Sequence, residues 1–195
     1  MRVIAGQWRS RVLLRPEGGQ TRPMPDRLRE AVFDIVGSWL GAPGRLPPIT
    51  VADVFAGSGA VGLEALSRGA ARCFFFERDP RALRTLRANL RSLEVGAEAS
   101  VLAVDAWSDG LLSVPAEHPV GLLVLDPPYR DARDASVEGK PGRFLADAAR
   151  SGRLADDVVA LVHHEASVRY ADFRPDWVCA DCRQYGTHGL SFFRL

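Results

Sequence analysis

The residues best suited to chemistry lie in the run Asp126-Pro127-Pro128-Tyr129, directly after the apolar stretch 120–125. That stretch is typical of a buried strand. Two prolines stop the strand and stiffen the backbone, because each fixes its own φ and restricts the residue before it. The end of this strand is therefore expected to hold a carboxylate, rigid carbonyl groups and an aromatic ring close together.

A second candidate segment lies earlier in the chain, where Gly57, Gly59 and Gly62 have the spacing G-x-G-x-x-G. These glycines follow the β-branched run 51–55 and precede an apolar helical pattern, which predicts a strand, a tight turn and a helix. Glycine gives such a turn unrestricted φ and lets a ligand approach the backbone, while the helix N-terminus offers N–H groups. The pattern favours a dinucleotide or a nucleoside-bearing cofactor such as S-adenosylmethionine, and a plain glycine-rich connection is the alternative.

Acidic residues end three of the expected strands. Glu77 closes the strand 72–77, Asp105 closes the strand 99–105, and Asp126 follows the third. Ligands of doubly wound sheets bind beyond the carboxyl ends of the strands, so these acids are expected to face one crevice. At the position of Glu77, a carboxylate commonly accepts hydrogen bonds from ribose hydroxyls.

Strand and helix patterns alternate along the chain and predict a doubly wound α/β fold with a mostly parallel sheet. A polar loop, 131–142, is expected to hang over the site as a lid. The other expected elements are a helix at 26–40 capped by Asp26, helices at 79–93 and 144–154, a strand at 158–162 and a closing antiparallel hairpin at 177–194.

The N-terminal region is basic although the net charge of the whole chain is only +1. The first thirty residues carry about +4 and the remainder about −3, which suggests a polyanionic partner. Arginines beside Trp8 combine phosphate contacts with a stacking face, as single-stranded nucleic acid requires; a β-ribbon packed on the domain is the alternative. The sequence is divided into a basic arm or hairpin, a helix with a Gly/Pro linker, and a catalytic domain, at 1–25, 26–48 and 49–195.

Several classes of protein and site are not favoured by the sequence. It has no long apolar run and no signal peptide at its start, so we expect a cytoplasmic protein without a membrane span. Cys179 and Cys182 have metal or redox spacing but lack a second pair. His163, His164 and Glu165 are consecutive on an expected strand, where neighbouring side chains point to opposite faces. No metal site is predicted.

The motifs together resemble a known family. A loop of the type D-x-F-x-G-x-G followed by DPPY resembles the amino-group methyltransferases that use S-adenosylmethionine. The resemblance narrows to the bacterial 16S rRNA (guanine-N2)-methyltransferase D family, it covers nearly the whole chain, and one departure is Pro25, where that family usually has Thr. The N-terminal segments that carry it are Arg2-Val3-Ile4-Ala5-Gly6-Gln7-Trp8-Arg9, Arg22-Pro23 and Asp26-Arg27-Leu28-Arg29-Glu30.

This resemblance implies a Rossmann-like class I methyltransferase that methylates the exocyclic N2 amine of a guanine in 16S rRNA of the small ribosomal subunit. In such an enzyme Asp126 and the carbonyl of Pro127 accept the amine hydrogens, and Tyr129 stacks on the base. The implied cofactor-binding residues are Asp53, Phe55, Gly57, Ser58, Gly59, Glu77, Asp105, Ala106 and Asp126. The expected RNA-binding residues are Arg2, Trp8, Arg9, Arg11, Arg22, Arg27 and Arg29. We expect a monomer.

Three alternatives remain open from the sequence. The DPPY motif is shared by enzymes that methylate adenine N6 or cytosine N4 in DNA or RNA. A NAD-dependent oxidoreductase could use the same glycines and acid, although it leaves DPPY unexplained. A non-catalytic RNA-binding scaffold is the third alternative.

Overall fold

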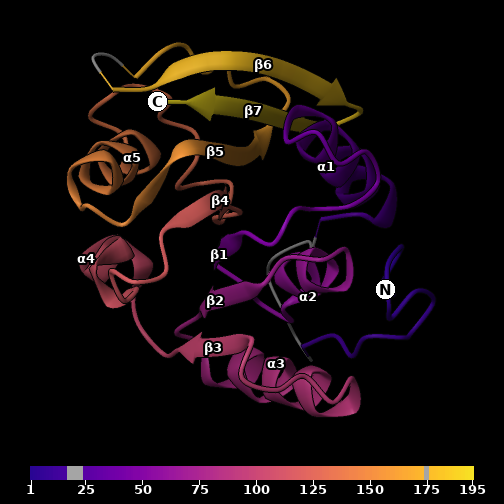
Figure 1. Ribbon diagram of the computed structural model, residues 1–195. Coiled ribbons are helices and arrows are strands. Elements are labelled where there is room, and N and C mark those ends of the chain that lie inside the picture. Colours follow the sequence, from indigo (N-terminus) through magenta and orange to yellow (C-terminus); the bar gives the residue numbers. More distant parts are fainter. Residues whose placement is uncertain (17–23, 174–175) are drawn as a thin grey trace. The chain divides into compact units, whose positions relative to one another are not determined.

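Three parallel strands form the centre of the first of two compact units, Met1–Val104 and Asp105–Leu195. The structure, a computed structural model, describes residues 1–16, 24–173 and 176–195. In the first unit the strand order is β3-β2-β1, and Figure 1 shows α2 and α3 beside these strands. Its elements are α1 (Asp26–Trp39), β1 (Thr50–Val54), α2 (Ala60–Ser67), β2 (Arg72–Phe76), α3 (Pro80–Ser92) and β3 (Ala99–Leu102).

The core of the first unit follows from its apolar pattern. β1 and β2 are buried along nearly their whole length, as parallel strands covered on both faces are. Helix α3 starts after Asp79, whose carboxylate accepts the N–H groups of Arg81 and Ala82 at 2.8 and 2.9 Å. The leucines of α3 point inward and its arginines are exposed. Local sequence therefore specifies both the start and the buried face of α3.

The N-terminal arm, residues 1–16, is fixed to the same unit by its backbone. The N–H groups of Ile4 and Ala5 donate to the buried carboxylate of Glu64 at 2.7 and 3.0 Å. Further along, the N–H of Leu14 donates to Asn89 Oδ1 at 2.8 Å. A Cβ at Gly6 would collide with the backbone of Ser67, so this approach requires glycine. Arg2 and Val12 form an antiparallel bridge, in agreement with the hairpin-like arm expected from the sequence.

The second unit is built on four strands in the order β4-β5-β7-β6. β4 and β5 are parallel, whereas β7 is antiparallel to both β5 and β6. In Figure 1 these strands lie one above another, with β4 lowest, then β5, and the β6–β7 hairpin at the top. Its elements are α4 (Ala106–Asp109), the 3-10 helix η1 (Gly110–Ser113), β4 (Val120–Leu125), α5 (Lys140–Arg150), β5 (Leu154–Glu165), β6 (Val178–Tyr185) and β7 (His188–Arg194).

Several element boundaries differ from those expected. Helix α5 begins at Lys140 and ends at Arg150, so the loop before it is shorter, and β5 starts at Leu154. Asp26 does not cap α1: Pro25 occupies the cap position, and the Asp26 carboxylate pairs with Arg29 at 2.9 Å. The closing hairpin is confirmed. The division at 1–25, 26–48 and 49–195 stays a prediction.

Helix length and polarity also bear on membrane insertion. Within the described ranges, no helix is both long enough and apolar enough to span a bilayer.

Candidate functional site

The glycine segment after β1 is a strained turn with open space at one position. Phe55, a non-glycine residue, has φ 71°, and Gly57 and Gly59 have φ 57° and 80°. A Cβ at Gly57 would meet nothing closer than 4.0 Å, whereas at Gly59 and Gly62 it would collide with Leu86 and Phe75 respectively. Strained backbone of this kind is concentrated at ligand sites. Gly57 therefore leaves room for a ligand, and the other two glycines allow close packing within the unit.

Two residues of the segment hold it in place. The buried carboxylate of Asp53 accepts the N–H of Gly62 at 2.9 Å, which fixes the first turn of α2. Ser58 is also buried, and its carbonyl accepts a hydrogen bond from Asn89 Nδ2 at 2.9 Å. These contacts order the turn from inside the protein. Direct contact of Asp53 and Ser58 with a cofactor stays a prediction.

Glu77 joins the end of β2 to the glycine turn. Its Oε2 accepts the N–H of Gly57 at 2.9 Å, and its Oε1 accepts the N–H groups of Arg78 and Asp79, each at 2.8 Å. A carboxylate has about four lone-pair positions, of which these three bonds occupy three. The side chain is half-buried and Oε2 retains acceptor capacity beside the open face of Gly57. This arrangement fits a ribose hydroxyl, which needs a fixed acceptor.

In the second unit, Asp126 lies directly after β4 and contacts a buried histidine. His163 Nδ1 is 2.6 Å from Asp126 Oδ1, and the His163 side chain is 0% exposed while that of Asp126 is 18% exposed. His163 lies on β5, where the parallel register pairs Leu125 with Val162 and so carries the next residue of each strand to the same level. The carboxylate is therefore fixed by one side chain and still accessible.

Tyr129 and His188 complete this cluster. The Tyr129 hydroxyl is 2.7 Å from His188 Nδ1 and 3.4 Å from His163 Nε2, and the two histidines approach at 3.0 Å between His163 Nε2 and His188 Nδ1. Their rings stack, with centroids 5.2 Å apart. Two of the side chains expected from DPPY are thus joined through two histidines, and we name Asp126, Tyr129, His163 and His188 the acid–tyrosine–histidine cluster.

Both histidines lie outside the residues predicted from the sequence for this site. His163 was expected only as a possible metal ligand, and no role was expected for His188. His164 points to the other face, as strand alternation predicts: its Nε2 is 2.9 Å from Ser191 Oγ, and burial lowers its pKa. Among the described residues, no group of three or more potential ligands could hold a metal ion.

Asp105 occupies the start of the short helix α4. Its carboxylate accepts the N–H of Trp107 at 3.1 Å, and Ala106 is buried. Both residues follow β3, which ends at Leu102. Their contact with an adenine ring stays a prediction.

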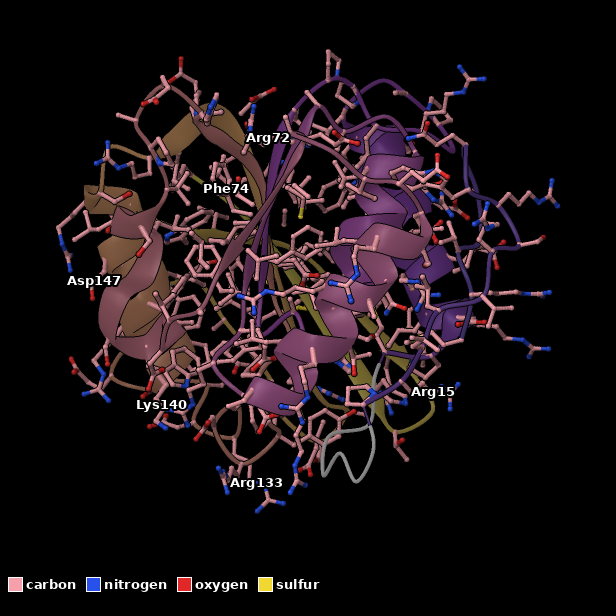
Figure 2. The ribbon with its side chains drawn as sticks, turned by 90° about the horizontal axis from the view of Figure 1, so that it is seen from below. Arg15, Arg72, Phe74, Arg133, Lys140 and Asp147 are labelled. Carbon is pink, nitrogen blue, oxygen red and sulfur yellow. The ribbon has the colours of Figure 1, made fainter. Side chains whose placement is uncertain are left out.

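The expected RNA-binding residues divide into exposed and buried ones. Arg2, Arg9, Arg11 and Arg27 are exposed and Trp8 is half-buried. Arg15, which Figure 2 labels, also lies on the surface of the arm. The exposed arginine row of α3 belongs to the same unit and consists of Arg81, Arg84, Arg87 and Arg91.

Arg29 corrects the expectation drawn from charge alone. Its side chain is 0% exposed, and its Nη2 donates to the carbonyl of Arg2 at 2.6 Å and to Asp26 at 2.9 Å. Its Nε also lies 3.8 Å from the buried Glu64. Arg29 therefore stabilises the arm and does not present its guanidinium to a ligand in this structure. Arg22 lies outside the described residues.

The two C-terminal cysteines lie side by side. A register shift in the β6–β7 ladder between Cys179 and Asp181 places Cys179 and Cys182 on one face, with 2.9 Å between the sulfur atoms. Burial, followed by the hydrogen bond from Cys182, raises the pKa of Cys179 to about 12. Neither residue forms a disulfide bond in this structure.

Comparisons with known proteins identify relatives over the whole chain. The family model described as conserved hypothetical protein 95 matches residues 1–194. Ribosomal RNA small subunit methyltransferase D of Escherichia coli (strain K12) is 40% identical over 168 residues, which cover 85% of this chain and 75% of that protein. YlbH of Bacillus subtilis (strain 168) is 32% identical over 196 residues, which cover 100% of this chain and 98% of that protein.

The fold is shared with solved structures. YhhF from Escherichia coli aligns with a TM-score of 0.76 and 33% identity, covering 99% of this chain and 96% of that chain. The expected fold class, a doubly wound Rossmann-like class I methyltransferase with a C-terminal antiparallel hairpin, is confirmed, and so is the family resemblance drawn from the motifs. The chain belongs to the conserved hypothetical protein 95 family, the family of the small-subunit rRNA methyltransferase D proteins, which are S-adenosylmethionine-dependent rRNA methyltransferases.

Proposed function

We propose that this chain transfers a methyl group from S-adenosylmethionine to the exocyclic N2 amine of a guanine in 16S rRNA of the small ribosomal subunit. The observation that carries the proposal is the acid–tyrosine–histidine cluster. It places a partly exposed carboxylate, Asp126, and a tethered aromatic ring, Tyr129, directly after β4 in a chain of this family. The relative from Escherichia coli named for small-subunit rRNA supports the substrate class.

The chemistry requires an acceptor beside the reacting nitrogen. A guanine N2 amine is a poor nucleophile, because its lone pair is delocalised into the ring. The carboxylate of Asp126 and the carbonyl of Pro127 accept the amine hydrogens and favour the pyramidal nitrogen. S-adenosylmethionine supplies an electrophilic methyl group on a sulfonium sulfur. In well-oriented systems, alignment of the reactants for such a transfer lowers the activation barrier by roughly 7–11 kcal/mol.

Tyr129 supplies the surface on which the base stacks. A guanine within folded RNA must leave its helix to reach the acceptors, and enzymes that act on bases stabilise the extruded base between side chains. Stacking of a base on an aromatic side chain is worth about 1–3 kcal/mol. A hydroxyl hydrogen bond to His188 at 2.7 Å orients this ring before the base arrives.

For the cofactor we assign Glu77 to the ribose hydroxyls and Gly57 to the open side of the turn, supported by the spare acceptor capacity of Glu77 and the space at Gly57. We assign Asp105 and the backbone N–H of Ala106 to the adenine. The remaining cofactor residues of the proposal are Asp53, Phe55, Ser58, Gly59 and Asp126.

For the substrate we assign the exposed arginines of the arm to RNA phosphates. Hydrogen bonds from backbone N–H groups hold the arm to α2 and α3, so the arm does not have to fold when RNA binds. Its exposed arginine side chains are then available for phosphate contacts. Arg2, Arg9 and Arg11 of the arm, together with Trp8 and with Arg27 on α1, form this set. The protein acts as a monomer in this proposal.

The experiment compares Asp126→Ala with Asp147→Ala. Asp147 is an exposed carboxylate on α5, labelled in Figure 2 and paired with Arg150 at 2.8 Å, and it is the matched control. We expect Asp126→Ala to abolish methyl transfer to small ribosomal subunits while the dissociation constant for S-adenosylmethionine changes little, because the other cofactor residues of the proposal remain in place. Equal loss of transfer and of cofactor binding would contradict the acceptor role. Methylation of adenine N6 or cytosine N4 instead of guanine N2 would refute the base assignment.

A further inference from the structure

We propose that His163 and His188 are positioning residues of the methyl-transfer site: His163 occupies one oxygen of Asp126 so that the other faces the substrate amine, and His188 holds the Tyr129 hydroxyl. The inference rests on the proposed function, because it assigns how the acceptor and the stacking ring of that reaction are held. Both histidines lie outside the motifs that the sequence singled out for catalysis.

His163 fixes the orientation of the Asp126 carboxylate. The terminal torsion of an aspartate is broad, so a carboxylate without a fixed partner samples many orientations. His163 Nδ1 lies 2.6 Å from Oδ1, a short contact, and hydrogen bonds to an ionised carboxylate are shorter and stronger than those between neutral groups. The His163 ring is completely buried on β5 and cannot follow a rotating carboxylate. With Oδ1 held, Oδ2 is left in a single orientation as the acceptor for the amine.

The two histidines also hold the side chain of Tyr129. Its ring meets the His163 and His188 rings edge-on, with centroids 5.5 and 6.3 Å away. The hydroxyl contact to His188 at 2.7 Å prevents the ring from swinging with its loop. A phenylalanine at this position would keep the stacking face and lose the tether. The tyrosine hydroxyl therefore restrains the position of the ring, which stacking alone does not require.

One assignment of protons satisfies the hydrogen bonds within the cluster. The Nδ1–H of His163 donates to Asp126, so Nε2 of the neutral ring is an acceptor. The Nδ1–H of His188 then points toward both His163 Nε2 at 3.0 Å and the Tyr129 oxygen at 2.7 Å. In this assignment each histidine carries a proton on Nδ1.

The experiment measures kcat and the dissociation constant for S-adenosylmethionine in methyl transfer to small ribosomal subunits. His163→Leu removes the donor to Asp126 and should lower kcat by about 100-fold, the effect of misplacing a reacting group by roughly 1 Å. His163→Asn keeps an N–H donor and should recover about tenfold of that loss. Cofactor affinity should stay unchanged in both variants.

His164→Asn is the matched control. His164 is the next residue of β5, is also buried and points to the opposite face, so its substitution should leave kcat unchanged. If His163→Leu does not fold, Tyr129→Phe tests the second half of the proposal, because it removes only a hydroxyl. Loss of one hydrogen bond worth about 1 kcal/mol predicts a roughly fivefold lower kcat.

The outcomes separate this proposal from the proposed function. Failure of the wild-type protein to methylate any rRNA would refute the proposed function. An active wild-type protein with unchanged kcat in both His163→Leu and Tyr129→Phe would overturn the positioning role alone. Nitrogen-15 spectra of the histidines give a readout independent of activity: protons on Nδ1 of His163 and His188 are expected, and protons on Nε2 of both would contradict the assignment.

Discussion

Glu77→Ala tests how the first unit holds its cofactor. The substitution removes a carboxylate that accepts three backbone N–H groups, at 2.9, 2.8 and 2.8 Å, and that we assign to the ribose. A hydrogen bond to a charged group contributes about 1.5–3 kcal/mol. Loss of one ribose bond of about 2 kcal/mol weakens binding roughly 30-fold, because each 1.4 kcal/mol is tenfold. Loss of the bond that orients Gly57 adds about 1 kcal/mol.

We therefore expect the dissociation constant for S-adenosylmethionine to rise about 100-fold in Glu77→Ala, measured by titration calorimetry. Glu77→Gln keeps one acceptor oxygen and should lie between the wild type and Glu77→Ala. Glu98→Ala is the control, because Glu98 precedes β3 instead of following a strand. An unchanged dissociation constant in a folded Glu77→Ala protein would rule out the proposed hydrogen bond between Glu77 and the ribose.

Three further predictions concern stability and thiol chemistry. Glu64→Gln leaves buried cations next to a neutral amide and should lower the free energy of unfolding by about 3–5 kcal/mol in urea titrations, and a loss below about 1 kcal/mol would contradict this. Burial lowers the pKa of His164, so the imidazole binds a proton more tightly in the unfolded chain than in the folded protein, and the free energy of unfolding should fall as pH drops through about 6.5. His164→Gln should flatten this pH dependence of stability, and an unchanged slope in the variant would contradict the prediction. Because the pKa of Cys179 is raised to about 12, the rate of its alkylation by iodoacetamide, measured by peptide mass spectrometry, should keep rising above pH 9. A rate that reaches a plateau below pH 9 would show a lower pKa.

Local sequence was sufficient for the parts of the site that lie within one element and its loop. The G-x-G-x-x-G spacing after an apolar strand predicted the tight turn that begins at Gly57, although not the positive φ of Phe55, and the acid at the end of the next expected strand predicted the position of Glu77. The DPPY run after β4 likewise placed Asp126 and Tyr129. In these cases residue type and position along the chain determine the geometry directly.

The remaining features depend on contacts between distant segments. His163 and His188 reach Asp126 and Tyr129 only through pairing of β5 with β4 and with β7, which no local pattern specifies. Arg29 is a charged residue on a helix, and only the packing of the arm and Glu64 makes it a buried partner. A search for histidines on the strands adjacent to a DPPY strand would have given a signal for His163.

Methylation of guanine N2 in 16S rRNA is tested by methyl transfer from labelled S-adenosylmethionine to unmodified small ribosomal subunits, naked 16S rRNA and DNA, followed by nucleoside analysis of each product. We expect N2-methylguanosine in 16S rRNA and no label in DNA. N6-methyladenine or N4-methylcytosine as the labelled nucleoside, or absence of transfer to every substrate with the cofactor bound, would contradict it.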